Sequence, residues 1–157
     1  MAGTETQASE SVVVSRPSPH VALLRIAEQP LGVLRVAAKR AISRALSDLE
    51  ADPDIRCVVL TGTGNAFSVG SDIREFQRDA GWLLAAEQAE VALDDQIEAA
   101  RFPVIAALNG AALGGCAVLA LACDIRVAAA SARIGLPEVK VGAFASGSGT
   151  KRLARLL

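Results

Sequence analysis

Apolar and polar residues follow two different periods along this chain. Near the N-terminus, the segments 11–15 (SVVVS) and 20–27 (HVALLRIA) are rich in β-branched and aliphatic residues and flank RPSP. This predicts a β-hairpin or two edge strands, with the prolines in the turn. Between residues 35 and 50, apolar side chains recur at helical spacing with charged ones between them, and Asp52-Pro53 ends the pattern. This segment predicts an amphipathic helix.

The rest of the chain consists of short apolar runs that alternate with helical segments. Turn-forming glycine, proline or asparagine residues separate many of these pieces. Strands that alternate with helices indicate an α/β fold with a parallel sheet and right-handed crossovers. We expect strands at 55–61, 104–108 and 125–129, and helices from about Asp72, at 82–101, at 113–122 and at 147–157.

One uncharged stretch, residues 104–123, is long enough to cross a bilayer and contains a GxxxG pattern. The Asn109-Gly110 pair inside it is a turn signal, which divides the stretch into two pieces that are each too short to span. Asp124 follows directly, without the aromatic or basic flank of a membrane helix. We therefore favour a strand and a helix of a globular domain over a transmembrane helix.

The composition fits one globular domain. The chain has 157 residues, of which 52% are hydrophobic and 21% are charged, and this is enough to bury a single core. The net charge is −1 and the Lys and Arg residues are scattered, so no basic face indicates binding to nucleic acid or to an anionic membrane. Residues 1–10 lack the basic start and apolar segment of a secretion signal, and we expect a disordered leader there, followed by a domain over 11–157.

The three cysteines, Cys57, Cys116 and Cys123, lie inside apolar runs and show no CxxC spacing. Their spacing favours neither a zinc site nor a disulfide framework, so no metal is expected. Free buried thiols are typical of a reducing compartment, and we expect a cytoplasmic location.

Two segments contain a strand, then small residues, then the start of a helix: VVLTGTGNAFSVGSDIREF from Val58 and VIAALNGAALGGCAVLALACD from Val104. Such turns place unpaired backbone N–H groups and the positive end of a helix dipole at the carboxyl edge of a sheet, where α/β proteins bind ligands. Two converging N–H donors stabilise an acyl oxygen that carries negative charge. For either turn alone, an ordinary connection between a strand and a helix is the competing interpretation.

A dinucleotide fingerprint is a further alternative for TGTGNAF. Phe67 occupies the position of the third glycine, and no helix begins directly after the glycines. The fingerprint is therefore not matched.

The third chemical feature is Glu138, which follows Pro137 in the stretch IGLPE. A carboxylate in an apolar cleft suits a general base or acid that works near pH 7. The alternative is a surface glutamate that precedes Lys140.

Together these features resemble the crotonase, or enoyl-CoA hydratase/isomerase, superfamily. The resemblance runs from about Val21 to the last residue and is carried by VVLTGTGNAFSVGSDIREF, PVIAALNGAALGG, LACDIRVAAASARIGLPEVKVG and GTKRL, in the family's order and spacing. It implies the α/β, crotonase-like (ClpP/crotonase) fold of repeated ββα turns, and an acyl-CoA small-molecule substrate. Coenzyme A would be part of the substrate, no other cofactor is expected, and the family assembles as homotrimers or hexamers.

The resemblance also assigns roles to single positions. The backbone N–H groups of Ser71 and Gly115 would form an oxyanion hole for the thioester carbonyl, and Glu138 matches the glutamate that moves a proton at the acyl chain. The remaining substrate-binding positions would be Ser68, Gly70, Asp72, Ile73, Arg74 and Gly114.

Two departures from the family pattern affect the function. Hydratases of the family usually carry a second glutamate shortly after the glycine pair, where this chain has Val118 in GGCAVL. One carboxylate suffices to move a proton between C2 and C4 of an enolate, so enoyl-CoA isomerase is favoured over a hydratase-like activity.

The second departure lies near the C-terminus, where ASGSGT (145–150) stands in place of PGAGGT and the helical region that follows in relatives is largely absent. We expect a core domain that is incomplete at this end. The alternative function is a truncated, catalytically impaired protein that acts at most as a CoA-binding or interaction module.

Overall fold

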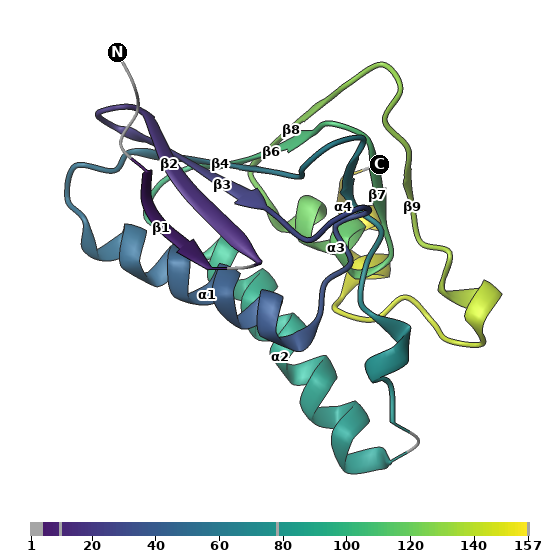
Figure 1. Ribbon diagram of the computed structural model, residues 1–157. Helices are drawn as coiled ribbons and strands as arrows, with labels where there is room; N and C mark the ends of the chain where they lie inside the picture. The colour runs from purple at the N-terminus through teal and green to yellow at the C-terminus, as the bar shows by residue number, and fades with distance from the viewer. Residues whose placement is uncertain (1–4, 10, 78, 157) are drawn as a thin grey trace.

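The computed structural model describes residues 5–9, 11–77 and 79–156. Its larger sheet has six strands in the order β1-β2-β3-β4-β6-β8 (Figure 1). The first three strands pair antiparallel and the last three join in parallel. The strands are β1 (Glu5–Ser9), β2 (Val12–Ser18), β3 (Val21–Ile26), β4 (Cys57–Thr61), β6 (Val104–Leu108) and β8 (Ile125–Ala128).

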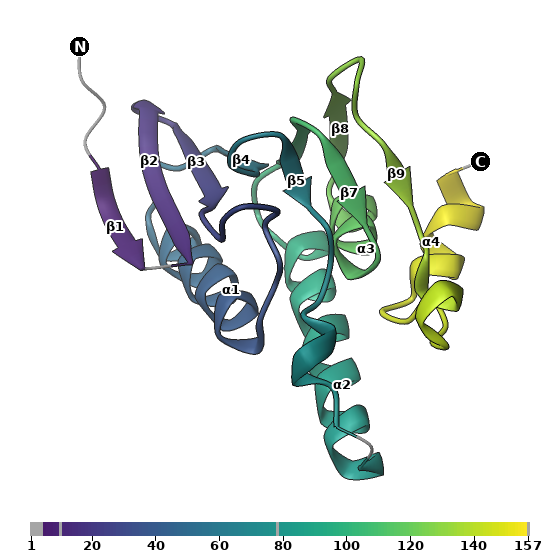
Figure 2. The same cartoon turned by 45° about the vertical axis from the view of Figure 1, so that its right-hand side comes forward.

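A second sheet of three short parallel strands lies beside the first. It has the order β5-β7-β9, formed by Ala66–Ser68, Ala111–Leu113 and Ile134–Gly135 (Figure 2). Each of these strands follows a parallel strand of the larger sheet along the chain, so β4-β5, β6-β7 and β8-β9 are successive pairs. The repeated ββα turns expected from the family resemblance are therefore present.

The first long helix follows β3 and the other three follow these strand pairs, and the helices lie on one side of the strands (Figure 2). Neighbouring helices along the chain also pack against each other, α1 on α2, α2 on α3 and α3 on α4. They are α1 (Val36–Ala51), α2 (Ala80–Glu98), α3 (Gly115–Ala122) and α4 (Gly149–Leu156), with two 3-10 turns, η1 (Ile73–Glu75) and η2 (Glu138–Val141). All four long helical segments expected from the sequence are confirmed, with shifted ends.

The core contains buried apolar residues from both sheets, from α2 and α3, and from α1. The helix turns one face inward, where its apolar residues are buried as the spacing predicts. Alternate residues of the strands are also buried, such as Leu24 of β3 and Leu60 of β4, both almost fully buried. The buried face of α1 consists of Ala38, Ala41, Ile42, Ala45, Leu46 and Leu49.

Residues 104–123 form β6, β7 and α3, so the globular interpretation of this stretch is confirmed. The turn at Asn109-Gly110 separates β6 from β7. Within the described residues, no helix combines the length and the apolar character that crossing a membrane requires.

The N-terminal expectations are partly wrong. Residues 5–9 of the expected leader form β1, because backbone pairing with β2 needs no apolar pattern; residues 1–4 and 10 lie outside the described residues. Strand β2 continues through Pro17 to Ser18, so the turn comes later than RPSP predicts. The pairing of β2 with β3 is irregular between Ser15 and Ser18, which accommodates a proline that cannot donate a ladder hydrogen bond.

Two helix starts also differ from expectation. The helix expected from Asp72 is a single 3-10 turn, Ile73–Glu75, that ends at Phe76. The helix expected from residue 113 begins at Gly115, because Ala111–Leu113 are occupied in pairing with β5 and β9.

Candidate active site

The two glycine turns that follow β5 and β7 touch each other. Gly70 has a φ of +100° and Gly114 has a φ of +58°, which are conformations that glycine adopts without strain. A Cβ atom on Gly70 would lie 2.8 Å from the carbonyl oxygen of Leu113 and 3.6 Å from the Cα of Gly114. The close packing of the two turns therefore requires glycine at position 70.

The residues after these glycines, Ser71 and Gly115, are brought together. A Cβ atom on Gly115 would lie 3.2 Å from Oγ of Ser71. In the described part of the chain, neither backbone N–H donates to a protein group. The N–H of Gly115 is the first of helix α3, where the helix dipole favours negative charge.

A segment before α1 holds the first turn in place. The N–H of Leu34 donates to the carbonyl of Gly70 at 2.8 Å, and the carbonyl of Leu34 accepts from the N–H of Asp72 at 3.0 Å. Ser68 is fully buried, and its hydroxyl donates to the carbonyl of Gly32 and accepts from the N–H of Gly70. Its side chain thus supports the turn from inside the protein.

Glu138 comes to the second turn from the neighbouring strand pair. Pairing of Leu113 with Gly135 brings β9 beside β7, and Glu138 opens the 3-10 turn that follows β9. Its Oε1 would lie 3.5 Å from a Cβ on Gly114. Its Oε2 is buried and, among the described side chains, is the one buried polar atom that has no hydrogen-bond partner. Such an atom costs folding free energy, which marks it as a candidate functional group.

The stretch from Asp72 to Arg74 divides into buried and exposed side chains. Asp72 is buried and accepts from the backbone N–H of Arg74 at 3.0 Å and from its Nε at 2.9 Å. These hydrogen bonds with Arg74 lower the pKa of Asp72 to about 2. Asp72 therefore caps the 3-10 turn, while Ile73 and the side chain of Arg74 face solvent.

Helix α2 adds charged residues that sequence reasoning missed. Glu90 accepts a hydrogen bond from the Ser71 hydroxyl through its Oε1 at 2.7 Å and forms an ion pair with Lys39 of α1. Lys39 also donates to the Ser71 hydroxyl at 2.9 Å. The only sequence signal for Glu90 was its place among the acidic residues of a helix, which is also typical of a solvated face.

A small pocket lies between these charged groups and the second turn. It is lined by Lys39, Ser71, Glu90, Asp94 and Gly115, with three leucines completing its wall. Its volume of about 10 Å³ gives room for about one water molecule. Helix α2 contributes both carboxylates of the lining, Glu90 and Asp94, and one of its leucines, and Gly115 lines the pocket from the start of α3.

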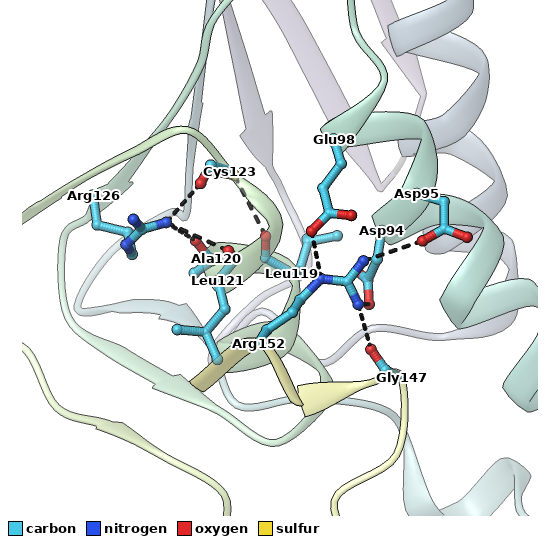
Figure 3. A network of polar contacts seen from close by, with 10 residues as sticks. All are labelled: Asp94, Asp95, Glu98, Leu119, Ala120, Leu121, Cys123, Arg126, Gly147 and Arg152. Atoms are coloured by element: carbon cyan, nitrogen blue, oxygen red, sulfur yellow. Dashed lines mark hydrogen bonds and ion pairs between the residues drawn. The ribbon is translucent and has the colours of Figure 1, made fainter. Parts of the chain in front are cut away.

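Arg152 fixes helix α4 to helix α2 (Figure 3). Its Nε donates to Glu98 at 2.9 Å and another nitrogen donates to Asp95 at 3.1 Å. Its third nitrogen donates to the carbonyl of Gly147 at 2.8 Å and lies 3.9 Å from a carboxylate oxygen of Asp94. Burial raises the pKa of Asp94 to about 8, although Arg152 opposes the shift.

The start of α4 and the loop before it pack tightly against α3. A Cβ on Gly149 would lie 2.6 Å from a methyl group of Val118. A Cβ on Gly147 would lie 3.4 Å from the same side chain and 3.2 Å from Asp94. At the other end of α3, Arg126 of β8 donates to the carbonyls of Ala120, Leu121 and Cys123 (Figure 3).

The amino-acid sequence matches one protein family along most of the chain. The family model described as enoyl-CoA hydratase/isomerase matches residues 21–157. A probable enoyl-CoA hydratase of Bacillus subtilis is 41% identical over 138 residues, which are 86% of this chain and 53% of the relative. The peroxisomal bifunctional enzyme of Danio rerio is 43% identical over 137 residues, which are 87% of this chain and 18% of that protein.

Solved structures give the same result. The crystal structure of an enoyl-CoA hydratase from Bacillus anthracis has a TM-score of 0.88 and 34% identity, covering 93% of this chain and 58% of the other. A Geobacillus kaustophilus structure with the same enzyme name reaches a TM-score of 0.92 at 29% identity, covering 99% of this chain and 59% of the other. The chain thus spans little more than half of each of these two structures, and with this fold and family match it belongs to the enoyl-CoA hydratase/isomerase family.

Proposed function

We propose that this chain forms the catalytic core of an acyl-CoA enzyme that stabilises a thioester enolate. The observation that carries the proposal is the pair of unpaired N–H groups of Ser71 and Gly115, with Glu138 beside the same turn. Backbone donors that are fixed before the substrate arrives stabilise negative charge on an oxygen without having to reorganise.

The backbone of the two turns suits this role. Gly70 and Gly114 have no side chains that would keep a thioester carbonyl away from the donors. The dipole of α3 adds positive potential at Gly115. The oxygen of the enolate would accept from both N–H groups, so the site stabilises the enolate more than the neutral thioester.

Glu138 is the group that moves the proton in this proposal. Its buried Oε2, which has no hydrogen-bond partner among the described residues, suits a base that takes a proton from C2. The resulting enolate can take the proton back at C4, which converts a 3-enoyl thioester into a 2-enoyl thioester. One carboxylate is enough for this isomerisation, and Val118 stands where a second glutamate would be.

Hydration of a 2-enoyl thioester is the second candidate. Relatives by sequence and by structure are named enoyl-CoA hydratases, including a probable one from Bacillus subtilis and the one from Bacillus anthracis. This reaction would use the same enolate and the same N–H donors, but it needs a further group that handles the proton of water.

Coenzyme A would enter as part of the substrate and would lie along the exposed side of the first turn. Ile73 and Arg74 face solvent there and could contact its adenine and pantetheine parts. Val139 and Phe144, which are 80% and 79% exposed, are large apolar side chains near Glu138 in the sequence. They support assembly with further copies of the protein, such as the trimer or hexamer of the family.

The test is turnover of 3-enoyl-CoA and 2-enoyl-CoA by the full-length protein and by Glu138→Gln. We expect the variant to lose at least about 100-fold in kcat, the usual contribution of a general base. Glu50→Gln is the control. It also removes a carboxylate, but it keeps the oxygen that accepts from the N–H of Arg101. Full activity of Glu138→Gln would refute the role of Glu138. Acyl-CoA binding without turnover in the wild type would favour the binding module instead.

A further inference from the structure

Two carboxylates flank the same pair of glycines. Glu138 reaches Gly114, where its Oε1 would lie 3.5 Å from an added Cβ. Glu90 reaches Gly115, where its Oε2 would lie 3.4 Å from an added Cβ. One carboxylate comes from the turn after β9 and the other from helix α2, so they approach the second turn from different elements.

The two oxygens of Glu90 have different surroundings. Oε1 accepts from the Ser71 hydroxyl and pairs with Lys39. Oε2 has no hydrogen-bond partner among the described residues, although the side chain is only 16% exposed. Glu90 is therefore held in position through one oxygen, and the other remains available to accept a proton.

The pocket at Glu90 offers a place for water. Its volume of about 10 Å³ gives room for about one water molecule, and it is lined by Lys39, Ser71, Glu90 and Asp94 as well as by three leucines. A water in a protein pocket needs two to four polar partners, and four of the lining residues have polar side chains. Gly115 also lines the pocket, which places the water site next to one of the two N–H donors.

Lys39 makes a carboxylate compatible with this location. An uncompensated negative charge beside Ser71 and Gly115 would oppose the negative oxygen that their N–H groups stabilise. Lys39, 14% exposed, pairs with Glu90 and reduces this repulsion. Asp94 lies in the same pocket with its pKa raised to about 8 by burial, so it is mostly uncharged at neutral pH.

We propose that Glu90 accepts the proton of a water molecule that adds to C3 of a 2-enoyl thioester, while Glu138 supplies the proton at C2. The inference rests on the proposed enolate chemistry. It assigns the second carboxylate of hydration to helix α2, in place of position 118 on α3.

Addition of water to the 2-enoyl thioester moves two protons and one electron pair. The water oxygen forms a bond to C3, and the electron pair of the C2=C3 bond moves toward the carbonyl oxygen, which Ser71 and Gly115 hold. Glu90 takes one proton of the water, and Glu138 in its acid form gives a proton to C2. The product is a 3-hydroxyacyl thioester, and exchange of one proton each with solvent restores both carboxyl groups.

The experiment compares two reactions in the full-length protein. Crotonyl-CoA hydration and conversion of 3-hexenoyl-CoA to its 2-enoyl isomer are measured for wild type, Glu90→Gln, Glu138→Gln and Glu87→Gln. Glu87 lies on the same helix and accepts from the N–H of Gly147, so it is a matched control for loss of a carboxylate. We expect Glu90→Gln to lower kcat for hydration by at least about 100-fold and to leave isomerisation close to wild type.

Each other outcome has a defined meaning. The inference is overturned if Glu90→Gln hydrates crotonyl-CoA at the rate of the wild type. It is also overturned if the wild-type protein does not hydrate crotonyl-CoA. An equal loss of both reactions also overturns it, because Glu90 would then act only through its contact with Ser71. If Glu138→Gln keeps both reactions at the wild-type rate, the proposed function is refuted instead. If Glu90→Gln does not fold, the double variant Lys39→Met/Glu90→Gln, which removes both charges of the ion pair, is tested in its place.

Discussion

Gly70 and Leu113 come from different strand pairs, yet a Cβ on Gly70 would stand 2.8 Å from the Leu113 carbonyl oxygen. This distance is shorter than van der Waals contact, and Gly70 also has a φ of +100°. The contact joins the turn that carries Ser71 to the turn that carries Gly115. It sets the separation of the two N–H donors.

Gly70→Ala tests this contact. We expect a loss of stability of at least about 1–3 kcal/mol from backbone strain, and loss of acyl-CoA turnover because the turns move apart. Urea denaturation and kcat measure the two effects. Gly64→Ala is the matched control, since Gly64 has a φ of +69° but open space around its Cβ position. Equal effects of the two substitutions would show that the contact with Leu113 does not matter.

Asn109 is expected to support the glycine-rich turn after β4. Its Nδ2 donates to the carbonyls of Gly64 and Ala66 at 2.9 and 3.0 Å, and its Oδ1 accepts from the N–H of Gly62 at 3.1 Å. Asn109→Ala leaves these backbone groups without partners and should lower the free energy of unfolding by about 1–3 kcal/mol. Asn109→Asp keeps only the acceptor and should still destabilise. Unchanged denaturation midpoints would contradict the assignment.

Asp94 makes stability depend on pH. Its pKa in the folded protein is about 8, above the ordinary value of 3.8. Between pH 3.8 and about 8, the folded state binds a proton that the unfolded state has released. Asp94 therefore contributes to the free energy of unfolding below pH 4, and this contribution is lost as the pH rises toward 8. Asp94→Asn should flatten this slope in denaturation at pH 4, 6 and 8. Asp95→Asn, which removes another carboxylate beside Arg152, serves for comparison.

Two of the three thiols should resist modification. Burial raises the pKa of Cys116 and of Cys123 to about 12, so little reactive thiolate forms at neutral pH. We expect these two cysteines to react with a thiol reagent only after unfolding, while Cys57 is half-buried and reacts faster. Titration with and without denaturant, followed by mass spectrometry, checks this. Rapid labelling of Cys116 in the native protein would contradict its position in the core.

The elements with a long or well-bounded pattern could be predicted from the sequence. Residues 104–108 form a strand with the expected limits, because Pro103 and Asn109 bound an apolar run. The second sheet could not be read from the residues alone, since β5, β7 and β9 have only two or three residues and show no period. Only the family resemblance pointed to the repeated ββα turns.

The candidate site was predictable where the backbone carries the chemistry. Gly70 and Gly114 marked the turns, and the structure brings Ser71 and Gly115 together as expected. The Ser71 hydroxyl, Lys39 and Glu90 were not foreseen as a unit, because charged residues on amphipathic helices usually face water. Contacts between α1, α2 and the first turn depend on packing that no local pattern encodes.

The strand order of the larger sheet also has a kinetic meaning. From β2 to β8, each strand of the larger sheet lies next to the strand of that sheet that precedes it in the chain. Such an arrangement keeps most pairings sequential, which shortens the loops that must close during folding. During synthesis, the Ser71 turn emerges first, the Gly115 turn second and Glu138 last. Glu138, the residue proposed to move the proton, is therefore synthesised after both turns that carry the proposed N–H donors.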